Sequence, residues 1–373
     1  MQPTGNRRIA VIMAGGSGER FWPLSRRTRP KQLLKLADPH LNLLEQSVRR
    51  IQELIPREAI YIVTARHLRD PIGSAQIGIP DRNILAEPCK RNTAGCLAYA
   101  AAHLSARLEI PANSTMAVLT ADHLIRDERS FRNAVEAALA TAEREEALVV
   151  IGIPPTRPET GYGYIEMQEG AAPVWTSPDG VEVLASAGFR EKPDRETALQ
   201  FVQSGRFFWN SGMFFWRLNV FLNELEQASP GHADVVARMT DALRAGENEE
   251  ADRIFESIED ASIDYALMEK ARHVRVVRAG FGWDDIGAWD ALDRTYEPDE
   301  NGNVTVGQPV VVESRDCIIY NDPGPARMAV AVAGVEGLAV IACADGVLVI
   351  PKDRAQDVRK VVAELKKKGF TQL

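Results

Sequence analysis

Short apolar runs alternate with helical patterns along the first 150 residues of the chain. The strand-like runs cover residues 9–13, 60–64, 83–86, 116–120 and 148–151. Between them, apolar residues recur at helical spacing over residues 43–54, 93–108 and 131–143. Strands that alternate with helices are typical of a mainly parallel sheet with helices on both faces. The pattern therefore predicts a doubly wound, Rossmann-like α/β domain.

The pattern changes after residue 160. Strand-like segments cover residues 161–167, 181–194, 207–216 and 273–280, and helical segments cover 195–204, 218–225 and about 251–271. A turn-rich acidic stretch follows at 296–303, and beyond it only short β runs occur until Pro351. The chain ends in an amphipathic, Lys-rich helix predicted over 355–368. We therefore predict a large domain over residues 1–300 and a small β-rich domain, ending in a helix, over residues 301–373.

Composition and charge exclude several classes of protein. The chain has 373 residues, 45% of them hydrophobic, and a formal net charge of −8. An acidic chain has no general attraction for nucleic acid or anionic membranes, so any anion site must be built locally. No run approaches the roughly 18 apolar residues of a membrane span, and the N-terminal segment is too short for a signal peptide. We expect a cytoplasmic protein whose four scattered cysteines, without CxxC spacing, stay reduced.

The clearest candidate for an anion site is VIMAGGSGERFWPLSRRTRPKQLLKL, at residues 11–36. A strand ends there in glycines, and basic residues follow at once. Glycine lets backbone N–H groups approach a phosphate closely. The segment fits neither a dinucleotide fingerprint, which would need glycine at Phe21, nor a Walker A loop, which would need Lys and then Ser or Thr after its glycines. A glycine turn beside a solvated basic face is the structural alternative.

Two further segments place polar groups at strand ends. LAEPCKRNTAGCLAYAA, at residues 85–101, opens a helix where Asn92 and Thr93 could bind a ligand, cap the helix, or do both. MAVLTADHLI, at residues 116–125, ends a buried strand in Asp122. Ligands of open α/β sheets bind at the carboxyl ends of strands, and Mg²⁺ is usually held by carboxylates together with substrate phosphates. Asp122 could also be a simple turn former.

The middle of the chain is rich in aromatic and charged residues. The segments are PETGYGYIE at 158–166, FREKPD at 189–194 and WNSGMFFW at 209–216. Hydrogen-bond acceptors between aromatic walls suit a hexose, although the aromatics could be core residues and Glu191–Lys192 a salt-bridged pair. Further on, FGWDDIGAWDAL at 281–292 puts Asp284 beside Asp285, a repulsive pair unless a cation or solvent offsets it.

In their order along the chain, these segments resemble the signatures of the sugar-1-phosphate nucleotidyltransferases. The first, in the form GGSGxRxWPLSRxxxPKQ, is similar to that of the mannose-1-phosphate guanylyltransferases. The resemblance covers about residues 8–295 and becomes loose beyond. It implies transfer of GMP from GTP to mannose 1-phosphate with Mg²⁺ or Mn²⁺ as cofactor, and the chain is too short for the isomerase domain of two-function relatives. The β-rich C-terminal region could pack against a partner, so we expect a homodimer.

The resemblance also assigns the site residue by residue. The catalytic residues, which neutralise phosphate charge, are Arg20, Lys31 and Lys192. The nucleotide is bound by Ala14, Gly15, Gly16, Ser17, Gly18, Glu19, Glu87, Arg91, Asn92 and Thr93. The sugar phosphate is bound by Tyr162, Gly163, Glu191, Lys192, Asn210 and Ser211. The metal is held by Asp122 and Asp285. His123 is then a supporting residue, and Asp284 stands where the family usually has serine, which leaves its role open.

The substrates imply a mechanism without a general base. A phosphate monoester has a second pKa of about 6, so mannose 1-phosphate is mostly dianionic at pH 7 and can attack the α-phosphorus of GTP directly. Catalysis would then rest on positioning and charge neutralisation. Two alternatives remain: a related nucleotidyltransferase with another base or hexose, and a sugar-nucleotide-binding protein without activity.

Overall fold

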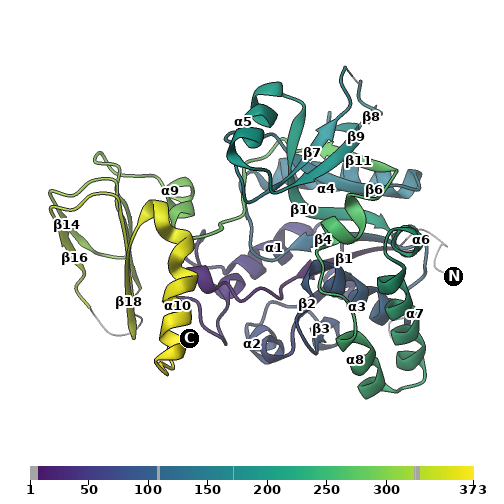
Figure 1. The fold of residues 1–373 in the computed structure, drawn as a ribbon, viewed down its shortest axis with the longest axis horizontal. Helices are drawn as coiled ribbons and strands as arrows, with labels where there is room; N and C mark the ends of the chain where they lie inside the picture. Colours follow the sequence, from purple (N-terminus) through teal and green to yellow (C-terminus); the bar gives the residue numbers. More distant parts are fainter. Residues whose placement is uncertain (1–6, 107–109, 171, 323, 325–327) are drawn as a thin grey trace.

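The computed structural model describes residues 7–106, 110–170, 172–322, 324 and 328–373. Figure 1 shows two parts of unequal size, a large part built around one long sheet and a small β-rich part at the end far from the N-terminus. The C-terminal helix α10 (Val358–Lys367) lies between the two parts.

One sheet forms the centre of the large part. Its strand order is β3-β2-β1-β4-β10-β6-β11-β9-β7, and β8 pairs with β9. The strands are β1 (Arg8–Met13), β2 (Ile60–Ala65), β3 (Ile84–Glu87), β4 (Thr115–Thr120), β6 (Leu148–Ile153), β7 (Gly163–Met167), β8 (Trp175–Thr176), β9 (Glu182–Glu191), β10 (Phe207–Arg217) and β11 (Val274–Arg278). β2 and β6 are buried along almost their whole length, so both faces of the sheet are covered. The predicted α/β fold is confirmed.

Strand direction divides the sheet into two halves. β3, β2, β1 and β4 pair in parallel, as predicted, and β6 pairs in parallel with β11. β10 enters antiparallel between β4 and β6, and β7 and β9 add further antiparallel pairs. The sheet as a whole is therefore mixed. Because β1, β3 and β4 run in the same direction, their carboxyl ends meet at one edge, where ligands of such sheets bind.

The helices follow the predicted pattern with several exceptions. They are α1 (Leu43–Ile51), α2 (Arg69–Ser74), α3 (Asn92–Ala106), α4 (Glu128–Arg144), α5 (Arg195–Ser204), α6 (Leu218–Ala228), α7 (Pro230–Arg244), α8 (Asn248–Glu256), α9 (Leu292–Thr295) and α10. α2, α7 and α9 were not predicted. The continuous helix predicted over 251–271 is wrong, because α8 ends at Glu256 and a π-helical turn, η6 (Asp264–Met268), follows only after a break.

The break after α8 has a local cause. The Ser257 hydroxyl donates to the carbonyl of Ile254 at 2.6 Å and so competes with helical backbone bonding. The helix α3 was predicted to end at residue 108. Its predicted final residues, 107 and 108, lie outside the described residues.

The apolar core falls into two main clusters. The larger one contains the central sheet and the helices packed on it. The second joins separate parts of the chain, and its members include Phe21, Trp22, Leu24, Leu124, Ile286, Trp289, Ile341, Leu348 and Val358. The glycine-rich segment and the loop that carries Asp285 are thus packed directly against the C-terminal part.

Short strands make up the C-terminal part. They are β13 (Val304–Val306), β14 (Val310–Val312), β15 (Ile318–Asp322), β16 (Ala331–Ala333), β17 (Leu338–Cys343) and β18 (Gly346–Pro351). β13, β15 and β17 pair in parallel and β18 closes that sheet antiparallel, while β14 pairs in parallel with β16. Among the described residues, no helix has the length and apolar character needed to cross a membrane.

Candidate functional site

The glycine-rich loop leaves the carboxyl end of β1 and passes close to Lys31. Gly18 has a φ of 63°, and a side chain there would overlap Lys31, so only glycine suits both the turn and the close approach. The carbonyl of Ala14 accepts hydrogen bonds from Gln32 Nε2 at 2.6 Å and from Thr64 Oγ1 at 2.9 Å. The loop backbone is therefore fixed from two sides.

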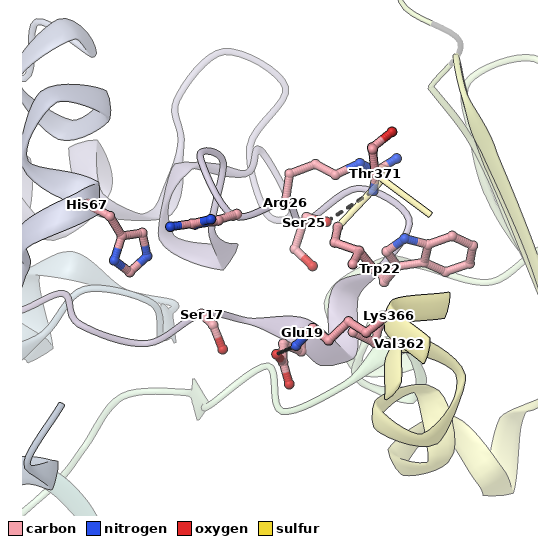
Figure 2. Close-up of a pocket in the computed structure, with 11 residues that line it drawn as sticks. Ser17, Glu19, Trp22, Ser25, Arg26, His67, Val362, Lys366 and Thr371 are labelled. Carbon is pink, nitrogen blue, oxygen red and sulfur yellow. Dashed lines mark hydrogen bonds and ion pairs between the residues drawn. The ribbon is translucent and has the colours of Figure 1, made fainter. Parts of the chain in front are cut away.

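A cavity of about 270 Å³ opens beside this loop. Its lining comes from the carboxyl ends of β1, β3 and β4 and from the start of α3, and includes Ala14, Gly15, Gly16, Gln32, Glu87, Arg91, Asn92, Thr93 and Asp122. The structure thus brings together most of the predicted nucleotide-binding residues. Ser17 and Glu19 instead line a second cavity of about 490 Å³, between the loop and the C-terminal helix (Figure 2).

Glu87, the last residue of β3, carries a buried carboxyl group in the wall of the smaller cavity. It is 6% exposed, and a Cβ built at Gly15 would lie 3.4 Å from its Oε2. Within the described residues this carboxyl group has no hydrogen-bond or ion-pair partner, and burial raises its pKa to about 8. A buried, unpaired acceptor is costly in the free protein and suits a ligand that brings N–H donors.

The start of α3 faces the same cavity. Asn92 has a φ of 56°, and its Oδ1 accepts a hydrogen bond from Thr93 N at 2.9 Å. The Thr93 hydroxyl accepts a bond from Ile263 N at 2.8 Å, and the Arg91 guanidinium donates to the carbonyl of Glu256 at 2.5 Å. These contacts tie the helix start to the break after α8. Arg91, Asn92 and Thr93 therefore have a structural role at the start of α3. Their contact with a nucleotide remains a prediction.

Lys31 bridges the two predicted metal-binding segments. Its buried Nζ donates to Asp122 Oδ2 at 2.9 Å and to the backbone carbonyl of Asp285 at 2.6 Å. Asp285 Oδ1 also accepts a bond from the Tyr162 hydroxyl at 2.6 Å. Burial acts to raise the pKa of Asp122, but the Lys31 ammonium and other neighbours outweigh it, and the pKa lies below its usual value. The structure thus brings Asp122 and Asp285 together, although they are far apart in the sequence.

Arg20 approaches the same carboxylates. Its Nη1 donates to Gln356 Oε1, in the C-terminal part, at 2.9 Å. Burial and the nearby Arg359 lower the pKa of Arg20. The charges of Asp285 and Asp122 act in the opposite direction, so the guanidinium lies near both carboxylates. Arginine stays charged at any physiological pH, and Arg20 is therefore a second fixed cation at this edge of the sheet.

His123 supports this edge, as predicted, through hydrogen bonding. Its Nδ1 accepts a bond from Trp283 Nε1 at 3.1 Å, so Nε2 carries the proton, 3.8 Å from Asp122 Oδ1. Burial lowers the pKa of His123, which keeps the imidazole neutral at pH 7. The contact with Trp283 fixes the ring beside Asp122.

Asp284, whose role the sequence left open, is a structural residue. Its side chain is buried and accepts hydrogen bonds from Arg294 Nε at 2.5 Å and from Ile286 N at 2.8 Å. Both carboxylate oxygens are used in this way. Asp284 therefore holds the shape of the loop from which Asp285 projects.

Asp122 and Asp285 suit a divalent cation that shares its coordination with a ligand. Within the part of the chain that the structure describes, no group of three or more His, Cys, Asp or Glu side chains has metal-binding geometry. Mg²⁺ is commonly held by one or two carboxylates and completes its shell with substrate phosphates and water. Two carboxylates beside a glycine-rich loop match that pattern, and oxygen donors favour Mg²⁺ or Mn²⁺ over zinc.

The predicted sugar segments meet where β7, β9 and β10 lie side by side. Gly163 pairs with Glu191 across β7 and β9, and a side chain at Gly163 would overlap the Glu191 carboxylate. Lys192 Nζ donates to Glu191 Oε1 at 2.6 Å, so the salt-bridged pair is present. The Lys192 side chain is nevertheless 57% exposed, which leaves its ammonium accessible to an anion.

The aromatic residues of this region divide into a wall and a core. The Tyr162 and Trp209 rings meet edge to face with centroids 5.3 Å apart. Phe215 and Trp216 are fully buried, so these two aromatics are core residues, one of the possibilities that the sequence left open. Ser211 is buried as well, at a bulge in β10, and its hydroxyl accepts a bond from a backbone N–H of the same strand at 3.2 Å. In this conformation the Ser211 side chain is not accessible to a hexose, and its predicted contact with the sugar remains a prediction.

Asp264 belongs to this group, although the sequence did not single it out. It opens the π-helical turn η6, and its Oδ1 accepts a hydrogen bond from Asn210 Nδ2 at 2.7 Å. Burial and then the charge of Glu191 raise its pKa to about 6. Glu191, Asn210 and Asp264 thus form a polar cluster, in which Asn210 donates to Asp264. The missed signal is an aspartate within the apolar stretch SIDYALM, because a buried aspartate is rare without a partner.

Known proteins resemble this chain over its whole length. A family model described as nucleotidyl transferase matches residues 9–301, and one described as MannoseP isomerase/GMP-like beta-helix domain matches residues 307–365. The chain is 38% identical over 369 residues to alginate biosynthesis protein AlgA of Pseudomonas putida, which covers 98% of this chain and 73% of the relative. It is 38% identical over 371 residues to a mannose-1-phosphate guanylyltransferase of Escherichia coli, with 98% and 75% covered.

A solved structure shows the same fold. The protein from Thermus thermophilus described as mannose-1-phosphate geranyltransferase superposes with a TM-score of 0.83 at 36% identity, over 96% of this chain and 99% of that one. The resemblance inferred from the signature segments is thereby confirmed. Since the nucleotidyl transferase model matches well over half of the chain, the protein belongs to the nucleotidyl transferase family.

Proposed function

We propose that the protein transfers GMP from GTP to α-D-mannose 1-phosphate, which gives GDP-mannose and pyrophosphate. Relatives named mannose-1-phosphate guanylyltransferase support the sugar and the reaction. The single observation in the structure that carries the proposal is the buried, unpaired carboxyl group of Glu87 beside the glycine-rich loop.

In its ionised form, which two N–H donors from a ligand favour, Glu87 suits guanine better than any other common base. Guanine presents N1–H and its 2-amino group side by side, and a carboxylate can accept both hydrogen bonds in a bidentate pair. Adenine and cytosine offer one amino group beside an acceptor nitrogen, and uracil offers one N–H between two carbonyls. Each of these bases would leave a buried carboxylate oxygen facing an acceptor, which is costly.

The triphosphate would lie along the glycine-rich loop. Gly15 and Gly16 line the cavity, Lys31 bonds to Asp122 in its wall, and Arg20 lies near the charges of Asp285 and Asp122. Asp122 and Asp285 would hold Mg²⁺, which when bound orients the phosphates and offsets the charge of the departing pyrophosphate. Lys31 would then exchange its bond to Asp122 for one to a phosphate oxygen.

The chemistry needs alignment more than proton transfer. A phosphate oxygen of mannose 1-phosphate forms the new bond to the α-phosphorus as the bond to the β-phosphate oxygen breaks. The attacking group is already an anion, so no general base is required. Lys192, Arg20 and Lys31 reduce the repulsion between the two anionic substrates, and charge neutralisation of this kind is the main source of catalysis in such transfers.

The hexose would be oriented by the acceptors at the end of β9 and in η6. Glu191, Asn210 and Asp264 can accept hydrogen bonds from sugar hydroxyls, and the Tyr162 ring can cover an apolar face of the sugar. Tyr162 also bonds to Asp285, so the sugar segments and the metal segment are in direct contact.

Pyrophosphate release by the purified protein tests the proposal. GTP, ATP, CTP and UTP are each combined with mannose 1-phosphate and with glucose 1-phosphate, in Mg²⁺. We expect GTP with mannose 1-phosphate to give the highest kcat/KM. Equal or better turnover of UTP with glucose 1-phosphate would identify a related nucleotidyltransferase instead. GTP binding without pyrophosphate release from any pair would support the non-catalytic alternative.

A further inference from the structure

The C-terminal segment holds the glycine-rich segment along its length. The Lys366 ammonium, on α10, donates to Glu19 Oε1 at 2.8 Å, and Figure 2 shows the two side chains meeting at one edge of the larger cavity. Beyond α10, the backbone carbonyl of Gln372 accepts a bond from Trp22 Nε1 at 2.7 Å. The C-terminal segment therefore contacts the glycine-rich segment through an ion pair from α10 and through a hydrogen bond from the residues that follow α10.

Apolar packing fixes the start of this C-terminal segment as well. η8 (Lys352–Asp357) precedes α10, and its Ala355 is 1% exposed within the cluster that contains Phe21 and Trp22. Val358, the first residue of α10, is fully buried in the same cluster. The backbone on both sides of residue 356 is therefore anchored on the glycine-rich segment.

This anchoring brings Gln356 to Arg20. The Gln356 Oε1 accepts a hydrogen bond from Arg20 Nη1 at 2.9 Å, a normal length for a charge-assisted bond. A guanidinium carries five N–H donors in one rigid plane. One bond at a single corner therefore restricts the orientation of the whole plane and leaves the other donors available for phosphate oxygens.

We propose that Gln356 is a positioning residue: its amide oxygen sets the orientation of the Arg20 guanidinium toward the triphosphate, and through this bond the C-terminal domain takes part in GTP binding. The inference rests on the proposed function, since it assigns Arg20 to the phosphates of GTP. Gln356 itself touches no substrate in this scheme.

Three substitutions at and near this position separate orientation from packing. Gln356→Met keeps the length of the side chain and removes the acceptor, whereas Gln356→Glu keeps an acceptor oxygen. Arg354→Ala is the matched control, because Arg354 lies on the same 3-10 helix, is exposed, and bonds to Asp357 at 2.7 Å. We expect Gln356→Met to raise the KM and the Kd for GTP about tenfold, the usual size of one charge-assisted bond. The KM for mannose 1-phosphate should change less than twofold.

Two comparisons decide the outcome: the conservative variant Gln356→Glu, and a double-mutant cycle with Arg20→Ala. The KM and Kd of Gln356→Glu for GTP should stay within about threefold of the wild-type values. Those of Arg354→Ala should equal the wild-type values. In the Arg20→Ala background, Gln356→Met should have no further effect, because its partner is gone. An equal loss in both backgrounds, a loss shared by Arg354→Ala, or an unchanged GTP affinity in Gln356→Met would overturn the inference.

Equilibrium GTP binding keeps this test separate from the reaction itself. If the wild type binds GTP but releases no pyrophosphate with any sugar phosphate, the proposed function fails. The comparison of GTP Kd values among the Gln356 variants would still report whether the residue acts through Arg20. A melting temperature within about 2 °C of the wild type shows that the fold is intact.

Discussion

Replacing Glu87 by glutamine should make the protein more stable and less selective at the same time. The carboxyl group is 6% exposed and unpaired among the described residues, and burial raises its pKa from 4.5 to about 8. The folded state then holds a proton that the unfolded state releases between these two pH values. The contribution of Glu87 to the stability of the wild type therefore falls as the pH rises from 4.5 to 8.

The size of the effect follows from the two pKa values. Each pH unit between them removes about 1.4 kcal/mol from the free energy of unfolding. Glutamine has nearly the same shape and no charge. Glu87→Gln should thus exceed the wild type by about 2 kcal/mol at pH 6 and, as an upper limit, by about 5 kcal/mol at pH 8.

Two assays measure the two halves of this prediction. Urea unfolding without nucleotide, from pH 5 to 8.5, gives the difference in stability, and Glu226→Gln, on the exposed face of α6, is the control. Pyrophosphate release with GTP and with ITP, which lacks the 2-amino group, gives base selectivity. The wild type should prefer GTP by about tenfold to a hundredfold, and Glu87→Gln should lose most of that preference. A stability difference that is constant with pH, or an unchanged GTP/ITP ratio, would refute the reasoning.

Four further substitutions test the remaining groups. Lys31→Met should lower kcat/KM for GTP about a hundredfold in a folded protein, and near-normal GTP kinetics would contradict its assignment to the triphosphate. Asp285→Asn should abolish activity over a full Mg²⁺ titration, and full activity at ordinary Mg²⁺ would remove it from the metal site. Lys192→Ala should raise the KM for mannose 1-phosphate only about fivefold, because the side chain is largely exposed. An equal rise in the KM for GTP would argue against the assignment of Lys192 to the sugar phosphate. The wild-type KM for mannose 1-phosphate should rise below about pH 6 as Asp264 gains a proton, and Asp264→Asn should lack the part of this rise that Asp264 causes.

The site residues that can best be predicted from the sequence are those at strand ends. Asp122 comes three positions after the apolar run at residues 116–119, so the end of β4 and the edge on which it lies can be predicted from the pattern. Asp285 has no such pattern around it, and its pairing with Asp122 came from the resemblance. The structure adds the physical link between them, the buried ammonium of Lys31.

Other site residues have no signal of their own in the sequence. Asp264 falls within a stretch that has helical spacing, so the pattern extends one helix through it and hides the break that turns its side chain toward Asn210. Gln356 is a polar residue at the start of an amphipathic helix, which ordinarily indicates a solvent-facing position. Its partner Arg20 is 336 positions away, and neither periodicity nor local motifs register a contact of that separation.

The charge balance at the edge of the sheet explains why these groups occur together. In the free protein, the carboxylates of Asp122 and Asp285 lie beside the cations of Lys31 and Arg20, and Lys31 is bonded to Asp122. A triphosphate brings several further negative charges to the same place. Lys31 can turn to a phosphate only if another cation replaces it at Asp122, since a partly buried carboxylate left facing a triphosphate without a counter-charge is unfavourable. Binding of nucleotide and binding of a divalent cation are therefore expected to depend on each other at this edge.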